Sequence, residues 1–398
     1  MSFLRAINLF PWDVASEGAA ECLGAITDLG CNSVVLSPNY HRARLFRPRT
    51  LGFYNRPIDW CDFRPDPSLY EEPGLLPPIN PDARCVEGCH QAAVAAKANG
   101  LDVIVSVIGC HNTTIGLSHP ELCVENAFGD RYAFALSPAQ PRVRSYLGSL
   151  VRDLCRQYRP SSILLDSFSY LDAVHREHHE LMFVSPGAFG KYLLSLCFCP
   201  ASCARLQREG IDPVALRAQV IKLVQHTVAN TPGPRSPEAE RDELTGLLFE
   251  FPEFLAAARI RSDIVAELLA HIAAIAREEG VRLHSQSALL ARPTSRVWTE
   301  GAGLRTRAES CEKIFIQAHW PSAREAIHDL SWAATVLPAE RFVLGTMTSE
   351  DNVATEADLV QRAVAAKRLG AAGVSFYNYG LLSAARLGWI RTANTSTR

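Results

Sequence analysis

The sequence lacks a charge imbalance, a membrane-spanning apolar run and a low-complexity tract. Its 42 acidic and 40 basic side chains give a net charge of -2, so no basic excess points to nucleic acid or to an anionic membrane surface. No apolar run approaches the roughly 20 residues that span a bilayer, and the opening MSFLRAINLFPWD reads as a strand rather than as a secretion signal. We therefore expect a cytoplasmic protein that binds small molecules and neither nucleic acid nor membrane.

The chain also lacks the features of a disulfide-stabilised secreted domain. Its 12 cysteines occur in 398 residues without an export signal, which favours reduced thiols over a disulfide framework. A hydrophobic content of 47% in a chain of this length can bury a large core. We expect residues 1–398 to form a single domain, and the sequence gives no indication of its oligomeric state.

What the sequence does contain is a repeated βα pattern. Short β-rich runs alternate with amphipathic segments in which apolar residues return every three or four positions, as in EADLVQRAVAAKRLGAAG. Eight such units predict a closed (β/α)8 barrel, that is, a TIM barrel of the α/β class. The predicted strands are residues 4–10, 32–38, 102–108, 161–167, 281–287, 313–319, 341–347 and 373–379.

Two predicted connections are much longer than the usual two to six residues. Residues 39–84 are rich in proline, arginine and aromatic side chains, and we expect an ordered lid over the C-terminal mouth of the barrel, with Trp60 or Tyr54 facing the pocket. Residues 171–280 carry helical patterns broken by NTPGPRSPEAERDE, which predicts a helical insertion after the fourth strand.

Functional side chains of such a barrel lie where strands end and the βα loops begin. His111 and Asp166 follow neighbouring predicted strands about 4.8 Å apart, so we expect them in one pocket. Asp166 comes directly after an apolar strand, where an ionised carboxylate needs a partner or a function; the structural alternative is an ion pair with an arginine or a cap. The strand-end candidates are Asp13, Asn39, His41, His111, Asn112, Asp166, His284, Gln286, Gln317, His319, Glu350, Asp351, Tyr377, Asn378 and Tyr379.

The segment HREHHE supplies His175, His178, His179 and Glu180 just after the fourth strand. These groups can ligate Zn²⁺ or Mn²⁺, hydrogen-bond to a polar substrate or to Asp166, or stay solvated. The HExxH order of a metalloprotease helix is absent. We therefore expect no cofactor and keep a divalent metal as an alternative.

The segment CFCPASC brings Cys197, Cys199 and Cys203 close together at the end of a helical pattern. Three thiols can hold zinc with a fourth ligand, but no second pair of cysteines lies nearby in the chain. Buried reduced cysteines that pack as small apolar side chains are the commoner outcome.

The fragment from His119 to Tyr170, HPELCVENAFGDRYAFALSPAQPRVRSYLGSLVRDLCRQYRPSSILLDSFSY, resembles barrels of the glycoside-hydrolase-like superfamily. The order HPE, asparagine, GD, SP, a helix with VR.Y and a strand ending in LD carries the resemblance, which covers about residues 102–180. It implies a carbohydrate-active (β/α)8 enzyme in which Asp166 matches the acidic position of the fourth strand. Two departures stand out: residues 281–287 end without a glutamate, and the fourth strand lacks an NE pair.

Three hypotheses follow. The first is a glycosidase with Asp166 as nucleophile or charge stabiliser, Glu180 as acid/base and His111 as a further catalytic group; Glu350 and Asp13 are weaker acid/base candidates. The second is a metal-dependent lyase, isomerase or hydrolase, and the third is a non-catalytic sugar-binding barrel. The partner is a glycoside or sugar, contacted by Asp13, Asn39, His41, Trp60, Asn112, His175, His178, His179, His284, Gln317, His319, Tyr377 and Tyr379.

Overall fold

The computed structural model describes residues 2–174, 184–230, 236–287 and 300–398. Eight parallel strands close into a barrel in the order β1-β12-β11-β10-β9-β8-β5-β2, so the predicted (β/α)8 barrel is confirmed. Each predicted run contains one of these strands. They are β1 (Leu4–Leu9), β2 (Ser33–Leu36), β5 (Asp102–Ile108), β8 (Ser162–Asp166), β9 (Arg282–Ser287), β10 (Lys313–Gln317), β11 (Phe342–Met347) and β12 (Gly373–Tyr377).

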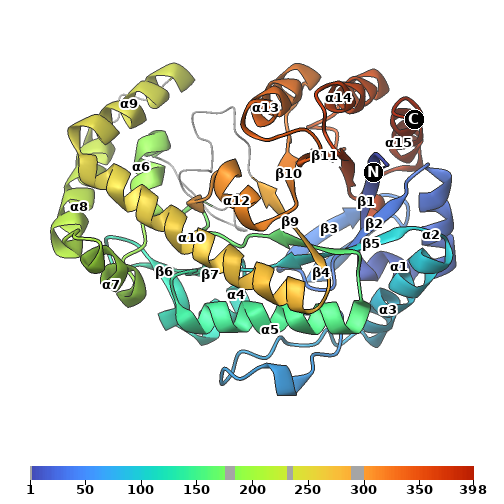
Figure 1. Ribbon diagram of the computed structural model, residues 1–398, viewed down its shortest axis with the longest axis horizontal. Helices are drawn as coiled ribbons and strands as arrows, with labels where there is room; N and C mark the ends of the chain where they lie inside the picture. The colour runs from blue at the N-terminus through green and yellow to red at the C-terminus, as the bar shows by residue number, and fades with distance from the viewer. Residues whose placement is uncertain (1, 175–183, 231–235, 288–299) are drawn as a thin grey trace.

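Amphipathic helices connect the strands and surround the barrel (Figure 1). Pro141 and Pro252 begin α5 and α10 at the first helical position, where a missing N–H costs nothing. These two long helices lie side by side. The helices of the barrel units are α1 (Pro11–Glu17), α2 (Ala19–Asp28), α3 (Ala83–Ala98), α5 (Pro141–Tyr158), α10 (Pro252–Glu278), α12 (Leu304–Ser310), α13 (Ala323–Val336), α14 (Glu356–Arg368) and α15 (Ala384–Thr395).

The remaining elements belong to the long connections. Residues 39–84 hold an antiparallel hairpin and a short 3-10 helix, and the stretch between β5 and α5 holds a second hairpin that sequence reasoning missed. In the described part of residues 171–280, helices α6 to α9 precede α10 and gather at the left of Figure 1, far from α1–α3. The elements are β3 (Ala43–Arg47), β4 (Gly52–Arg56), η1 (Pro67–Leu69), α4 (Thr113–Ser118), η2 (Pro120–Leu122), β6 (Cys123–Glu125), β7 (Arg131–Leu136), α6 (Gly187–Leu194), α7 (Pro200–Arg208), α8 (Pro213–Ala229), α9 (Pro237–Glu250) and η3 (Tyr379–Leu381).

The barrel interior is layered along the strand direction. Side chains alternate between the interior and the helices, and the interior is filled at mid-height by an apolar layer: Ala6, Val35, Ile104, Leu164, Phe315, Val343 and Ala372. Because Leu164 faces inward, Asp166 two residues later faces the same way at the C-terminal end. Polar side chains in the barrel are therefore confined to its two mouths.

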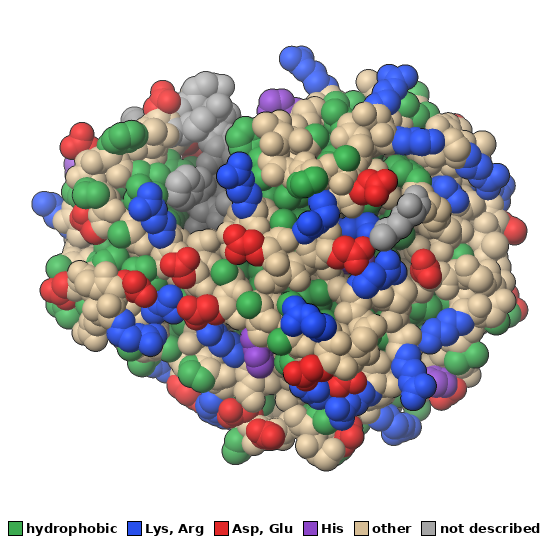
Figure 2. Space-filling model, viewed as in Figure 1, with side chains coloured by type: hydrophobic (Ala, Val, Ile, Leu, Met, Phe, Trp, Pro, Cys, Tyr) green, Lys and Arg blue, Asp and Glu red, His purple; other side chains and the backbone are tan. Residues whose placement is uncertain are grey.

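The face of the molecule in Figure 2 carries charges of both signs. On the face in Figure 2, basic and acidic side chains are interspersed, as the near balance of charges in the sequence predicts. Within the described residues, no helix combines the length and apolarity that crossing a membrane requires.

Candidate active site

A cavity of about 310 Å³ opens at the carboxyl ends of the barrel strands. Its floor includes Leu164 and Phe315 of the apolar layer, and its walls are polar. All eight strands, or the residues directly after them, contribute side chains. These are Asn8, Ser37, Ser106, Ile108, Asp166, Ser167, Gln286, Ser287, Gln317, Met347, Ser375 and Tyr377, among others.

Asp166 stands at the rim of β8 and lines this cavity. The hydroxyl of Ser167 donates a hydrogen bond to Oδ1 of Asp166 at 3.0 Å. The backbone carbonyl of Asp166 accepts from the Gly109 amide at 2.9 Å, and this bond joins β8 to the loop after β5. Ser167 has a φ of 59°, a left-handed conformation that costs a residue with a Cβ about 1 kcal/mol or more. The chain therefore turns sharply just after the carboxylate and leaves it at the strand end.

One wall of the cavity is a stack of three rings. The rings of Tyr40 and His41 lie 4.2 Å apart, and the imidazoles of His41 and His111 stack at 4.4 Å with an angle of 26°. Burial lowers the pKa of His41, against the opposing effect of the Asp166 and Asp59 charges. Since its Nδ1 lies 2.8 Å from the carbonyl of Arg42, Nδ1 carries the proton of the neutral ring and Nε2 is left as an acceptor.

Tyr40 also pairs with Tyr377 from the end of β12. Their hydroxyl oxygens are 2.5 Å apart. Burial raises the pKa of Tyr40 to about 12, and burial together with the Tyr40 contact raises the pKa of Tyr377 further; the Asp166 charge contributes to both shifts. Two protonated phenols therefore stand near the Asp166 carboxylate.

Sequence reasoning missed the other charged groups of the cavity, Asp172, Glu300 and Arg307. Arg307 makes an ion pair with Glu300 at 3.1 Å and donates to the Ser285 hydroxyl at 2.9 Å. Oδ1 of Asp172 accepts from the Val174 amide at 3.0 Å. Asp172 follows Asp166 on the same βα loop, so a search of the whole loop would have found it, whereas Glu300 and Arg307 follow no strand directly.

The structure brings seven of the predicted residues together around this cavity: Asp166, His111, His41, Gln286, Gln317, His319 and Tyr377. Gln317 donates from its amide nitrogen to the side-chain oxygen of Gln286, which holds both amides at the wall. The predicted His175, His178, His179 and Glu180 lie outside the described residues.

Asn39 and Asn112 do not line the cavity, because both amides serve the backbone. Asn39 donates to the carbonyl of Ile108 at 2.8 Å and accepts from its amide at 3.1 Å, so it joins the loop after β2 to β5. Asn112 caps α4 by accepting from the Ile115 amide at 2.9 Å. Short polar side chains at strand and helix ends often have such backbone partners.

Asp13, Trp60 and Tyr379 also lie away from the cavity lining. Asp13 is fully buried in α1 and accepts from the Phe10 amide at 3.3 Å. The Tyr379 ring lies under the Arg49 guanidinium at 4.3 Å. The carbonyl of Trp60 accepts from Arg56, and the lid residues that reach the cavity are Tyr40 and His41. Tyr54 lines no part of the cavity either, since its ring stacks on Trp12 at 4.6 Å.

His284 lies at the opposite end of the barrel. It is 3% exposed, next to the Phe315 ring, and lines a second cavity of about 750 Å³ at the N-terminal ends of the strands. Its place as the third residue of β9, rather than the last, explains this position. Burial lowers its pKa to about 4.

The described part of the chain brings no three His, Cys, Asp or Glu side chains into an arrangement that holds a metal ion. His111, His319 and Asp166 border the same cavity without forming such a group.

No protein-family model and no curated protein sequence matches the chain. Solved structures do match over almost its whole length. The glycoside hydrolase domain of PgaB (BpsB) from Bordetella bronchiseptica aligns with a TM-score of 0.63 and 13% identity, covering 98% of each chain. This chain therefore shares the (β/α)8 barrel fold of that glycoside hydrolase domain.

Two further solved structures share the barrel fold. A β-galactosidase from the psychrophilic Marinomonas ef1 aligns with a TM-score of 0.57 and 11% identity, over 98% of this chain and 58% of that one. An α-L-fucosidase from Paenibacillus thiaminolyticus aligns with a TM-score of 0.56 and 12% identity, over 99% and 49%. These alignments show the barrel fold over 98–99% of this chain.

Proposed function

We propose that this protein is a carbohydrate-active enzyme that hydrolyses a glycosidic bond with Asp166 as its central carboxylate. The observation that carries the proposal is the position of Asp166 at the end of β8, inside the polar cavity at the C-terminal mouth of the barrel, where (β/α)8 enzymes place their chemistry. The likeness to solved glycoside hydrolase barrels supports it at the level of the fold.

The cavity has the chemistry that a sugar ring requires. The Tyr40, His41 and His111 rings offer flat faces for sugar C–H groups. The amides of Gln286 and Gln317 line the opposite strands and can hydrogen-bond to hydroxyl groups. A cavity of about 310 Å³ is at the lower end of the range for small-molecule sites, so it holds one or two sugar residues.

In this mechanism Asp166 stabilises the positive charge that develops at the anomeric carbon, as nucleophile or as counter-charge. The Ser167 hydrogen bond holds one carboxylate oxygen, which fixes the direction of the other. The neutral His41 ring and the protonated Tyr40 add no competing positive charge beside it. Fixed negative charge at this position acts mainly on the transition state.

The loop after β8 also supplies the second carboxylate that this mechanism needs. Glu300 is held by Arg307 at 3.1 Å, so its negative charge is already compensated. Asp172 lines the cavity six positions after Asp166, and we assign it the acid/base role together with the sequence candidate Glu180. A substrate with a highly acidic phenol as leaving group needs no protonation, so loss of the true acid/base should cost far less on it than on an alkyl glycoside.

The test is a screen of oligosaccharides and aryl glycosides for new reducing ends, followed by the Asp172→Asn and Glu180→Gln variants on the two leaving-group classes. The proposal expects cleavage by the wild type and a leaving-group-dependent loss in one variant. Binding of sugars without cleavage would instead support a non-catalytic sugar-binding barrel.

The metal-dependent alternative rests on His111, His319 and Asp166 around one cavity. Elemental analysis of the purified protein, with activity measured before and after chelation, distinguishes the metal-dependent mechanism from the carboxylate mechanism. Hydrolysis that survives chelation supports the carboxylate mechanism, and parallel loss of a stoichiometric metal and of activity contradicts it.

A further inference from the structure

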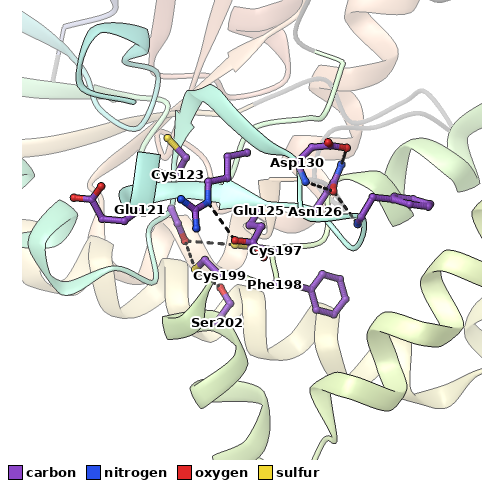
Figure 3. Close-up of polar contacts among 12 residues, drawn as sticks. Glu121, Cys123, Glu125, Asn126, Asp130, Cys197, Phe198, Cys199 and Ser202 are labelled. Carbon is purple, nitrogen blue, oxygen red and sulfur yellow. Dashed lines mark hydrogen bonds and ion pairs between the residues drawn. The ribbon is translucent and has the colours of Figure 1, made fainter. Parts of the chain in front are cut away.

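Cys197 and Cys199 form a thiol pair between α6 and α7, outside the candidate active site. The Ser137 hydroxyl lies 3.7 Å from the sulfur of Cys197 and 3.5 Å from that of Cys199, and Cys199 is also 3.4 Å from the Ser202 hydroxyl. Figure 3 shows Cys197, Cys199 and Ser202 gathered beside the β6–β7 hairpin. The two thiols thus share the Ser137 hydroxyl as a partner, and they are also hydrogen-bond partners of each other.

The surroundings of Cys197 favour its thiolate. Burial raises its pKa, but hydrogen bonds from the Cys199 thiol, the Ser202 hydroxyl and backbone amides outweigh burial and hold the pKa well below the usual range. Cys199 donates its proton in this pair, so its own pKa is raised.

Every other cysteine of the chain has a raised pKa. Burial raises the pKa of Cys110, Cys155 and Cys311 to about 12, and the remaining cysteines are shifted upward as well. The thiolate is the reactive form of cysteine, and these raised pKa values leave little of it at neutral pH. Nucleophilic reactivity is therefore concentrated at Cys197.

A small cavity reaches this sulfur. It measures about 20 Å³ and is lined by Cys197 together with Tyr170, Phe198, Ser202 and mostly aliphatic side chains. A cavity of about 10–15 Å³ holds one water molecule, so this one admits a solute little larger than water. Cys197 itself is only 6% exposed, which excludes larger disulfide reagents from direct attack.

We propose that Cys197 and Cys199 are a modification site, a dithiol that hydrogen peroxide oxidises to a reversible disulfide. The Cys197 thiolate attacks one peroxide oxygen, the O–O bond breaks, and hydroxide leaves as Cys197 becomes a sulfenic acid. The Cys199 sulfur then attacks the sulfenic sulfur; the S–S bond forms, the S–O bond breaks, and the departing oxygen leaves as water with the Cys199 proton. The two thiols lose two electrons, and one peroxide becomes two waters.

The pair is joined to the wall of the candidate active site. Ser195, two residues before Cys197, accepts from the Ala173 amide at 3.0 Å through its hydroxyl and from Arg261 at 2.7 Å through its carbonyl. Arg261 in turn lies over the Tyr170 ring at 4.0 Å. A disulfide that displaces Cys197 therefore shifts the segment that carries Asp172, whatever reaction the cavity performs.

The experiment treats the native protein with hydrogen peroxide, alkylates the remaining thiols and analyses the peptides by mass spectrometry. We expect the peptide with Cys197 and Cys199 to lose the mass of two hydrogen atoms, and dithiothreitol to restore it. Hydrogen exchange of residues 169–174 should change on oxidation, while that of α14 stays constant. In Cys199→Ser, dimedone should label Cys197 as a sulfenic acid; Cys203→Ser is the matched control and should still form the disulfide.

The proposal is overturned if both thiols alkylate fully after peroxide treatment, or if the disulfide joins Cys199 to Cys203. Unchanged exchange in residues 169–174 would overturn the link to the cavity. None of these measurements needs turnover, so they stand apart from the proposed hydrolase activity, and the wild-type experiment remains decisive even where a variant fails to fold.

Discussion

The hydroxyl oxygens of Tyr40 and Tyr377 lie 2.5 Å apart at the mouth of the barrel. Tyr40 comes from the long connection after β2 and Tyr377 from the end of β12, so this contact fixes the connection to the barrel rim. Both phenols are partly buried and their pKa values are raised, so both are protonated at neutral pH and one of them donates to the other.

We predict that Tyr377→Phe and Tyr40→Phe each lower the free energy of unfolding by about 1 kcal/mol, because each leaves a partly buried hydroxyl without this partner. The double variant should be little less stable than either single one, since both polar groups are then gone. Urea unfolding of the four proteins measures the coupling. Strictly additive losses would show that the two hydroxyls do not depend on each other.

Asp13 should make the protein less stable as the pH rises. Burial raises its pKa from 3.8 to about 7, so the folded state binds a proton more tightly than the unfolded state does. This contribution is complete below about pH 4 and is lost as the pH rises through about 7, with an upper size of about 4 kcal/mol. The melting temperature should fall less between about pH 4 and 7 in Asp13→Asn than in the wild type. If the melting temperatures of both proteins change with pH in parallel, the raised pKa of Asp13 is refuted.

His284 should make the protein less stable as the pH falls. Burial lowers its pKa from 6.5 to about 4, so the unfolded state binds the proton more tightly, and stability is lost as the pH falls from about 6.5 towards 4. The loss is on the order of 3 kcal/mol. His284→Asn should lose this acid sensitivity and keep normal turnover, because the residue lies at the far end of the barrel. A large fall in turnover in His284→Asn would instead show that His284 takes part in the reaction.

The barrel could be predicted from the sequence because each strand is a short apolar run and each barrel helix has a clear period, as in β5 and α14. The β6–β7 hairpin escaped prediction because β6 spans only Cys123–Glu125. Such a short strand has too few residues to show alternation.

Position within a strand, more than residue type, decided which site predictions the structure brings to the cavity. Asp166 is the last residue of β8 and reaches the rim, whereas His284 sits mid-strand in β9 and faces the other mouth. Asn39 follows β2 directly, yet its amide is used by the backbone of Ile108. Glu300 lines the cavity from a segment that does not directly follow a strand, so no local sequence pattern predicts its position.

The most direct test of the account measures turnover and thermal melting on one sample of Asp166→Asn. Asparagine preserves the size of the side chain and an acceptor for the Ser167 hydroxyl, so the fold should survive and the melting temperature should change little. Turnover of a cleaved glycoside should fall by about 10²-fold or more, since fixed charge at the transition state is among the largest contributions to catalysis. An Asp166→Asn protein that melts early but keeps near-normal turnover would contradict the account and leave Asp166 a structural residue.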